Sequence, residues 1–366
     1  MRGSDLDEDD VRIRPGKGKS RPRSKDRPDH QTATSALVVA VDRGRYTCAV
    51  GTGVKVRLVT AMAARELGHR AVVVGDVVGL VGEHLSARGA DGREDLARVV
   101  RVEPRRTALR RTADDNDATE RVIVANAVLL AIVVAAGEPE PNLRLLDRCL
   151  VAAYEGGLQP VLVVTKTDLA PVTVLAEAID GLDVELLELH RGPAGALVGV
   201  DVVAAYLGTS MTVLVGSSGV GKSTLVNALV PSADRATGAV NAVTGRGRHT
   251  SSSAVALLTP AGGWVIDTPG VRSFGLAHVS PAGVLAGFAD LAAAAEQCPR
   301  GCEHRSAAEG CELDAECAAR GINPRRLDSF RRLLSAREAD PASAREADPA
   351  QLPAGNRPVQ TESEPV

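Results

Sequence analysis

The chain has 366 residues, with 44% hydrophobic and 24% charged side chains and a formal net charge of −3. This is the composition of a soluble globular protein, and the length allows two or three domains that each bury a core. The longest apolar stretch, residues 122–136, is shorter than the roughly 20 residues that a membrane-spanning helix needs, and the N-terminus carries no apolar core of a secretory signal. We therefore expect a cytoplasmic protein without a membrane partner, and we interpret residues 122–136 as a buried parallel strand with its approach.

Both ends of the chain lack the apolar residues that a folded core needs. Residues 5–10 are an acidic cluster, and residues 12–27 form a basic arm with almost no apolar side chains. We predict that residues 1–34 are disordered; the arm is either a solubilising tail or an attachment to nucleic acid. At the other end the sequence SAREADPA occurs twice in succession, which indicates a disordered tail with a tandem repeat over residues 335–366.

Short segments of β type, separated by turn signals, follow the basic arm. We expect strands at residues 37–41, 46–50, 54–59, 71–81 and 96–102, with a loop over residues 83–94. Five short strands suit a small barrel, so we predict an OB-fold RNA-binding domain over residues 35–112. Tyr46 is the only aromatic residue of this region, so RNA would be held through its phosphates and its shape, not by stacked bases. The candidate phosphate contacts, for which a solvated basic linker is an equally good account, are Arg105, Arg106, Arg110 and Arg111.

Buried strands alternate with helices from residue 120 onward. We expect strands at residues 128–134, 161–164, 184–189, 212–215, 255–258 and 264–266, with helices at residues 143–154 and 223–229. This alternation is typical of a doubly wound α/β domain, which we assign to residues 113–279. Ligands of such sheets bind at the carboxyl ends of the strands.

A complete phosphate-binding loop stands between a predicted strand and a predicted helix. Its glycines allow backbone N–H groups to turn inward on phosphates, Lys222 is expected to neutralise the β- and γ-phosphates, and Ser223 is expected to hold Mg²⁺. A plain glycine turn before a helix is the less favoured alternative, because the full signature is present in its proper context. The predicted binding residues are Gly216, Ser217, Ser218, Gly219, Val220, Gly221, Lys222, Ser223 and Thr224.

Two further motifs follow predicted strands. Asp267 begins the sequence DTPG, as expected for a carboxylate that orients Mg²⁺ through water and a glycine that senses the γ-phosphate. The sequence TKTD suits guanine, because the carboxylate of Asp168 can accept hydrogen bonds from N1–H and the exocyclic amine together, a pair that adenine does not offer. Thr165 replaces the usual Asn, which alters one contact to the base edge. The predicted base-binding residues are Thr165, Lys166, Thr167 and Asp168.

Residues 245–253 are polar and lie between predicted strands, which favours a switch loop with Thr250 as a second Mg²⁺ ligand; a plain basic loop is the alternative. Val271 stands where many GTPases carry a water-positioning Gln. We therefore expect slow intrinsic hydrolysis that needs help from His249 or from a partner. The candidate catalytic residues are Lys222, His249, Thr250 and Asp267.

A cysteine cluster near the C-terminus has metal-ligand spacing. Three thiolates and one imidazole suit a closed, tetrahedral structural Zn²⁺ site, one per chain, in a small helical domain over residues 280–334. The helix that closes this domain is expected at residues 324–334. Cys317 could replace one ligand, whereas the isolated Cys48 and Cys149 are interpreted as buried packing residues. The predicted ligands are Cys298, Cys302, His304 and Cys311.

The order of the nucleotide motifs is unusual, because residues 165–168 precede the phosphate loop and residues 267–270 follow it. In ordinary GTPases the phosphate loop comes first, so this order indicates a circularly permuted GTPase domain. With the barrel before it and the zinc unit after it, the chain over residues 37–334 resembles the ribosome small-subunit-dependent GTPase family RsgA, also called YjeQ. The segments PRRTALRR at residues 104–111 and Asp147-Arg148 add to the resemblance.

The resemblance implies a GTPase that is stimulated by the small ribosomal subunit and acts as a late assembly and checkpoint factor on that subunit and its rRNA. It implies that GTP or GDP binds at residues 165–168 and 216–224, with Mg²⁺, and that zinc binds at the Cys/His cluster; we expect a monomer. The main alternative is an RNA-binding scaffold that binds nucleotide with little turnover. An ATP-dependent kinase or transporter-type ATPase would need an acceptor or helper motif that the sequence lacks.

Overall fold

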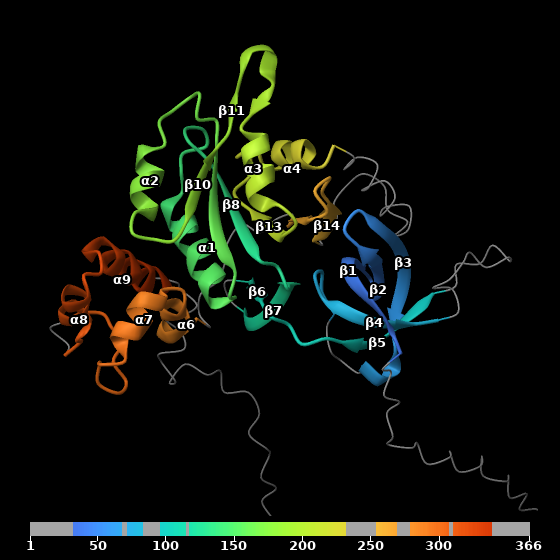
Figure 1. The fold of residues 1–366 in the computed structure, drawn as a ribbon, viewed down its shortest axis with the longest axis horizontal. Helices are drawn as coiled ribbons and strands as arrows, with labels where there is room; N and C mark the ends of the chain where they lie inside the picture. The colour runs from blue at the N-terminus through green and yellow to red at the C-terminus, as the bar shows by residue number, and fades with distance from the viewer. Residues whose placement is uncertain are drawn as a thin grey trace, which may run out of the picture.

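The computed structural model describes residues 32–67, 72–82, 96–114, 117–231, 254–268, 279–306 and 310–338. Figure 1 shows a small barrel, a central sheet flanked by helices, and a helical unit near the C-terminus. Most of the predicted basic arm, nearly all of the predicted tail, the predicted loop at 83–94 and the predicted switch loop lie outside the described residues. Within the described ranges, every helix is too short or too polar for a bilayer crossing.

The N-terminal part is a closed five-stranded barrel, as predicted. Its strands run in the order β1-β2-β3-β5-β4, and β4 closes on β1; the pairing is antiparallel except between β3 and β5. This is the strand order of an OB-fold. Alternate side chains fill the interior, among them Val38, Cys48, Val78 and Val99. The strands are β1 (Thr34–Asp42), β2 (Arg45–Thr52), β3 (Lys55–Ala63), β4 (Val77–Val81) and β5 (Ala97–Val102).

A hairpin that the sequence did not predict joins the barrel to the central sheet. It consists of β6 (Ala108–Asp114) and β7 (Asp117–Ala125), so the expected domain boundary at residue 112 falls inside β6. The apolar stretch at 122–136 was interpreted as a buried parallel strand with its approach; residues 129–135 do form a parallel strand, whereas the approach contains the end of β7 and a turn. The chain turns at Asn126, which adopts a positive φ of 57° and donates from Nδ2 to Gly75 O at 2.9 Å. An asparagine tolerates this left-handed conformation, so it ends one strand before the next begins.

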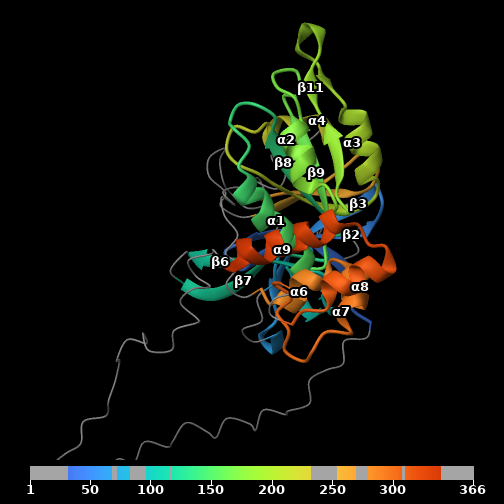
Figure 2. The ribbon, with the colours of Figure 1, turned by 90° about the vertical axis from the view of Figure 1, so that its left-hand side faces the viewer.

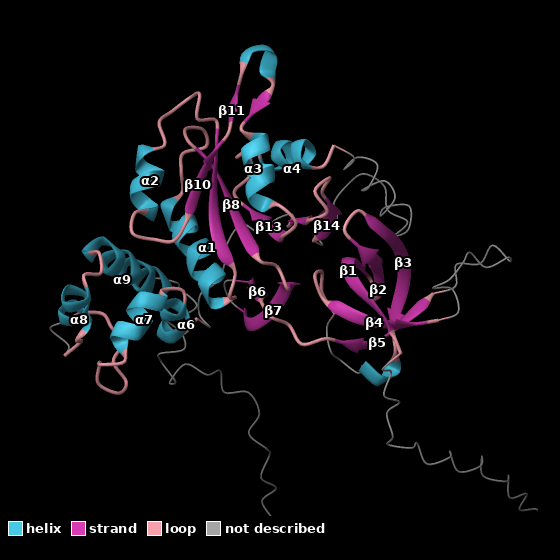
Figure 3. Cartoon of the chain, in the orientation of Figure 1, coloured by secondary structure: helices cyan, strands magenta, loops and turns pink. Residues whose placement is uncertain are grey.

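The central sheet has the strand order β10-β9-β8-β13-β15-β14 and is parallel except between β14 and β15. Successive residues of β8 face opposite layers: Ile132 packs in the core with residues of α1 and α2, and Val133 packs in the core with residues of α3 and α4. Figure 3 shows the helices beside the strands of this sheet. Both faces are therefore buried, as the apolar strands predicted. The strands are β8 (Leu129–Ala135), β9 (Gln159–Thr165), β10 (Glu185–Glu188), β13 (Met211–Val215), β14 (Val255–Leu258) and β15 (Trp264–Asp267). The helices are α1 (Leu143–Glu155), α2 (Thr173–Ile179), α3 (Val200–Leu207) and α4 (Lys222–Leu229).

The C-terminal unit is a small helical cluster that packs against α1 (Figure 2). Phe288 and Phe330 form its centre, with ring centroids 5.4 Å apart in an edge-to-face arrangement. Arg332 Nη1 lies 2.9 Å from the Oδ1 atom of Asp147 on α1, which ties the unit to the central domain. Its helices are α6 (Pro281–Ala286), α7 (Ala289–Ala295), α8 (Leu313–Arg320) and α9 (Pro324–Glu338). Residues 335–338, which were expected in the tail, thus belong to α9.

Candidate nucleotide site and metal centre

The predicted phosphate loop connects β13 to α4. Gly221 caps the helix at a φ of +93°, in the left-handed region that favours glycine. Gly216 leaves the strand at a φ of +156°, and a Cβ atom there would lie only 2.4 Å from the carbonyl oxygen of Val133. The first glycine is therefore required by the close approach of β8, and the last one is required by the turn into the helix.

Two side chains of the predicted base segment bind the outside of this loop. Thr165 Oγ1 donates to Val220 O at 2.6 Å, and Lys166 Nζ donates to Gly219 O at 3.0 Å. The C=O of one residue and the N–H of the next lie in one planar unit and point in opposite directions. Because the base segment holds these carbonyls, the N–H groups of Val220 and Gly221 are directed away from it, where an anion would bind.

Lys166 itself has a positive φ of 59°, and its ammonium group also donates to the carbonyl oxygen of Glu138. The base segment, the phosphate loop and the loop before α1 are thus joined at one side chain. The sequence predicted that Thr165 contacts the base of the nucleotide, but its hydroxyl donates to the phosphate loop instead. This arrangement depends on the three-dimensional proximity of residues more than 50 positions apart, and the sequence carried no signal for it.

Asp168 is exposed at the end of the base segment, where a purine can reach it. Its Oδ1 atom accepts a hydrogen bond from the backbone N–H of Arg191 at 3.3 Å. Arg191 belongs to a short projecting hairpin of β11 (His190–Arg191) and β12 (Leu197–Val198), visible at the top of Figure 1. This hairpin lies between Leu189 and Gly199, where the family resemblance implies a second motif that supports the guanine base. Its backbone holds the Asp168 carboxylate beside Arg191.

The predicted magnesium carboxylate lies beside the predicted phosphate lysine. Asp267 Oδ1 is 3.8 Å from Lys222 Nζ, and Lys222 Nζ is 3.5 Å from Thr268 O. Asp267 Oδ1 is buried and accepts no hydrogen bond from the described residues. A buried carboxylate oxygen without a hydrogen-bond donor fits a role toward the water molecules bound to a cation. Ser223, the residue after Lys222, is exposed on the first turn of α4. These residues fit Mg²⁺.

The remaining predicted residues of this site are not all described. His249 and Thr250 lie outside the described residues, as do Gly270 and Val271. The structure therefore brings together the base segment, the phosphate loop and Asp267.

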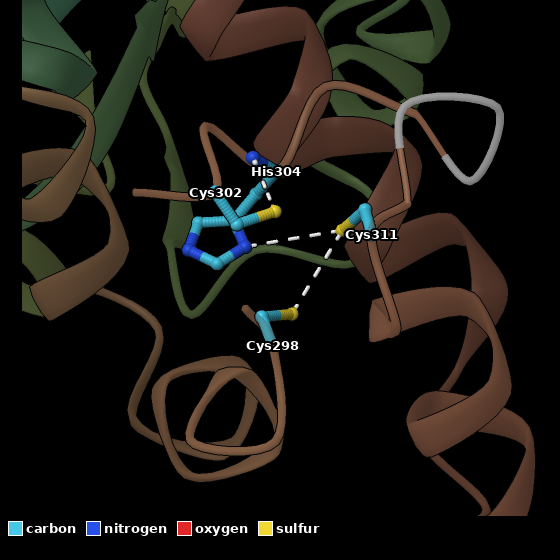
Figure 4. A group of neighbouring side chains, drawn as sticks. All are labelled: Cys298, Cys302, His304 and Cys311. Atoms are coloured by element: carbon cyan, nitrogen blue, oxygen red, sulfur yellow. Dashed lines mark hydrogen bonds between the residues drawn. The ribbon is translucent and has the colours of Figure 1, made fainter. Parts of the chain in front are cut away.

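The four predicted metal ligands converge (Figure 4). Their ligand atoms all lie within 4.8 Å of one another, with Cys298 Sγ 4.0 Å from Cys311 Sγ and Cys311 Sγ 3.8 Å from His304 Nδ1. A tetrahedral zinc with bonds of about 2.3 Å to sulfur places neighbouring ligand atoms about 3.8 Å apart. The backbone N–H of His304 also donates to Cys302 Sγ at 3.4 Å. The group therefore has the size and the donor chemistry of a closed zinc site.

Neighbouring residues prepare the histidine as a ligand. Burial, and then the charge of Arg331, lower the pKa of His304, which favours the neutral imidazole that a metal ligand needs. Arg331 donates to His304 O at 3.3 Å and makes a bidentate ion pair with Asp314 at 2.9 and 2.6 Å. Cys317 is buried outside the four-residue group. Cys48 and Cys149 are buried, and burial raises the pKa of each to about 12, which confirms that they are packing residues.

Comparison with known proteins agrees with this arrangement. A family model described as RsgA GTPase matches residues 102–277. The chain is 37% identical over 254 residues to the small ribosomal subunit biogenesis GTPase RsgA of Pseudomonas aeruginosa, which covers 67% of this chain and 72% of that relative. The crystal structure of YjeQ from Thermotoga maritima has a TM-score of 0.59 at 22% identity, over 84% of this chain and 99% of that one. YloQ, described as a circularly permuted GTPase, has a TM-score of 0.59 at 19% identity, over 85% and 97%. Both structures share the fold predicted from the sequence.

The hydrogen bond from Thr165 to the phosphate loop makes a prediction for nucleotide binding. Thr165→Val keeps the shape of the side chain and removes the donor, so Val220 O loses its partner. We expect GDP affinity to fall about tenfold, the effect of roughly 1.4 kcal/mol for one lost buried hydrogen bond. Thr165→Ser keeps the hydroxyl and should bind GDP as the unmodified protein does. Titration of a fluorescent GDP analogue measures both; equal affinities of the two variants would contradict the assigned contact.

The metal centre predicts a difference between two neighbouring cysteines. Cys311→Ala removes a ligand and should abolish bound zinc, whereas Cys317→Ala, also buried, should retain it. Elemental analysis of the purified proteins distinguishes them, and zinc retained by both or lost by both would count against the proposed ligand set. Burial raises the pKa of the Cys311 thiol, and zinc binding must displace its proton, so zinc affinity should fall as the pH is lowered.

Proposed function

The chain belongs to the RsgA family of GTPases, and we propose that it binds the small ribosomal subunit and its rRNA and hydrolyses GTP to GDP and phosphate there, as a late assembly and checkpoint factor. The observation that carries the proposal is the contact of Thr165 and Lys166 with the carbonyls of the phosphate loop. It joins a candidate guanine-reading carboxylate and a candidate phosphate cradle in one site. The relative in Pseudomonas aeruginosa is named a small ribosomal subunit biogenesis GTPase, and this supports the choice of partner.

The proposed roles follow the geometry. The N–H groups of residues 216–224 and the ammonium of Lys222 bind the phosphates, and Asp168 accepts from the Watson–Crick edge of guanine. Ser223 and Thr250 would hold Mg²⁺, and Asp267 would orient the ion through water; the ion would supply positive charge that neutralises the charge developing on the phosphates. Lys222 Nζ lies 3.8 Å from Asp267 Oδ1, which supports a role for both groups at the same phosphate.

The attacking water needs a positioning group. Val271 offers no hydrogen bond, so we assign this role to His249, which the sequence places just before Thr250. We expect hydrolysis to be slow unless a partner supports His249 in this role. This is the physical reason for a dependence on the small subunit.

The flanking units hold the protein on RNA. The barrel contacts phosphates through arginine and lysine side chains, and one structural Zn²⁺ stabilises the C-terminal unit. We propose that the protein is monomeric and cytoplasmic, where its ribosomal partner is assembled. The domain limits predicted from the sequence stay a proposal, with the β6–β7 hairpin as the connection between the first two domains.

A second candidate function is an RNA-binding scaffold with little turnover. The apolar Val271 and the replacement of Asn by Thr165 favour it, because one removes a water-positioning group and the other a base contact. The two functions differ in whether small subunits stimulate phosphate release.

The experiment measures phosphate release from GTP by the unmodified protein, by Lys222→Ala and by His249→Ala, each with and without small subunits. The unmodified protein should be stimulated. In Lys222→Ala the stimulated rate should fall about 10²- to 10³-fold, and GDP should bind weakly. In His249→Ala the stimulated rate should fall about 10²- to 10⁴-fold, while the affinity for GDP is retained.

The absence of any stimulation in the unmodified protein would favour the scaffold. A stimulated His249→Ala variant with a normal rate would contradict the assignment of the water-positioning role.

A further inference from the structure

One strand of the barrel also belongs to the central sheet. The first half of β1, residues 34–37, pairs with β4 and closes the barrel, whereas Ala40 pairs with Val255 at the start of β14. The register of β1 against β2 shifts between Val38 and Ala40, which marks a bulge where the strand passes from one sheet to the other. The barrel is therefore joined to the nucleotide-binding domain by strand pairing as well as by the chain between them.

β14 stands between the barrel and the acidic residue of the nucleotide site. Val255 is the Cα partner of Ala40 on one side and of Asp267 on the other. Asp267 in turn pairs with Leu214 in the strand that leads to the phosphate loop. Because neighbouring strands lie about 4.8 Å apart, only about 10 Å separates the barrel strand from the backbone of Asp267.

Apolar packing makes this junction stiff. Val39 and Ala49, on the outer surface of the barrel, are buried in the same core as Ala256 of β14. Beyond the other end of β14, a Cβ atom on Gly262 would lie 3.4 Å from the Cα atom of Gly53, so the β14–β15 turn touches the β2–β3 turn of the barrel. Close-packed contacts of this kind transmit displacement. A shift of β14 therefore strains its pairing with β1.

A buried ion pair anchors the bulge of β1. Asp76 is fully buried, and its carboxylate accepts from Arg105 Nε at 2.7 Å and Nη2 at 2.8 Å. The backbone of Gly75 and Asp76 pairs with both backbone polar groups of Val38 in β1: Gly75 N donates to Val38 O at 2.8 Å, and Val38 N donates to Asp76 O at 2.9 Å. A Cβ atom on Gly75 would lie 1.9 Å from Ala125 O, so this anchor is also pressed against β7.

We propose that the barrel is a built-in regulator of the nucleotide site and that it acts through the β1–β14 junction. The edge of a sheet is where a partner chain commonly adds a strand, and here the barrel occupies that edge from within the same chain. A change in what Asp267 contacts, when GTP becomes GDP, displaces β15 and β14 and alters the pairing of β14 with β1, which reorients the barrel. A macromolecule that holds the barrel constrains Asp267 in return, with the same coupling free energy. The first half rests on the proposed role of Asp267, and the second half rests on the proposed partner as well.

The first test needs no ribosome. Hydrogen exchange of the full-length protein is compared with GDP and with a non-hydrolysable GTP analogue. Peptides that cover Val39 and the following residues of β1 should differ between the two nucleotides by about fivefold or more in exchange rate. Peptides from β5 should exchange at the same rate with both nucleotides, because among the described strands β5 pairs only with strands of the barrel. Equal exchange of β1 with both nucleotides would overturn the proposal.

The second test locks the junction. Directly opposed residues of an antiparallel pair have the Cα separation that a disulfide needs, so Ala40→Cys with Val255→Cys should cross-link on oxidation. The matched control is Asp42→Cys with Arg45→Cys, a pair within the barrel hairpin, oxidised in the same way to account for effects on other cysteines. Only the first cross-link should remove the exchange difference in β1 and lower small-subunit stimulation about tenfold. Reduction should restore both, with GDP affinity unchanged.

A locked junction that keeps both the exchange difference and the stimulation would refute the coupling. If the unmodified protein showed the exchange difference but no stimulation, the proposed function would fail while the coupling within the chain stood.

Discussion

Two adjacent side chains, Thr165 and Lys166, hold the phosphate loop in the orientation that the nucleotide site requires. Their contacts with the carbonyls of Val220 and Gly219 cross the end of β8, which separates β9 from β13 in the sheet. The direction of the loop's N–H groups, away from the base segment, follows from these contacts, because each peptide unit is planar. The position of the base relative to the phosphates follows as well, since the same segment carries Asp168. Without this contact the motifs would be two neighbouring loops and not one site.

The order of the motifs along the chain does not alter the site, because the site is built by strands that are neighbours in the sheet and not in the sequence. The permuted order matters in another way. The chain enters the central sheet at β8 and leaves it after β15, and these two strands flank β13, which leads to the phosphate loop. The chain toward the C-terminal unit therefore leaves from the carboxyl end of β15, beside the nucleotide site, whereas the hairpin from the barrel enters at the amino end of β8, at the other end of the strands. A unit that follows β15 is well situated to respond to the bound nucleotide.

Sequence patterns predicted the features that depend on local periodicity and spacing. The alternation of Ile132 and Val133 between two cores, the burial of Cys48, and the convergence of four metal ligands were all expected from composition and spacing. Features that depend on contact between distant segments were missed. Asn126 breaks an apolar run because its side chain binds Gly75 in the barrel, and the hydroxyl of Thr165 binds a loop 55 residues away. No periodicity encodes such contacts, since each depends on the completed fold.

The central claim is that the TKTD segment and the phosphate loop form one guanine nucleotide site. A crystal structure of the protein with GDP tests it most directly. The account predicts the diphosphate inside the loop of residues 216–222, with N1 and the exocyclic amine of guanine within hydrogen-bonding distance of the Asp168 carboxylate. A diphosphate bound elsewhere, or a guanine base turned away from Asp168 while the phosphates occupy the loop, would contradict it.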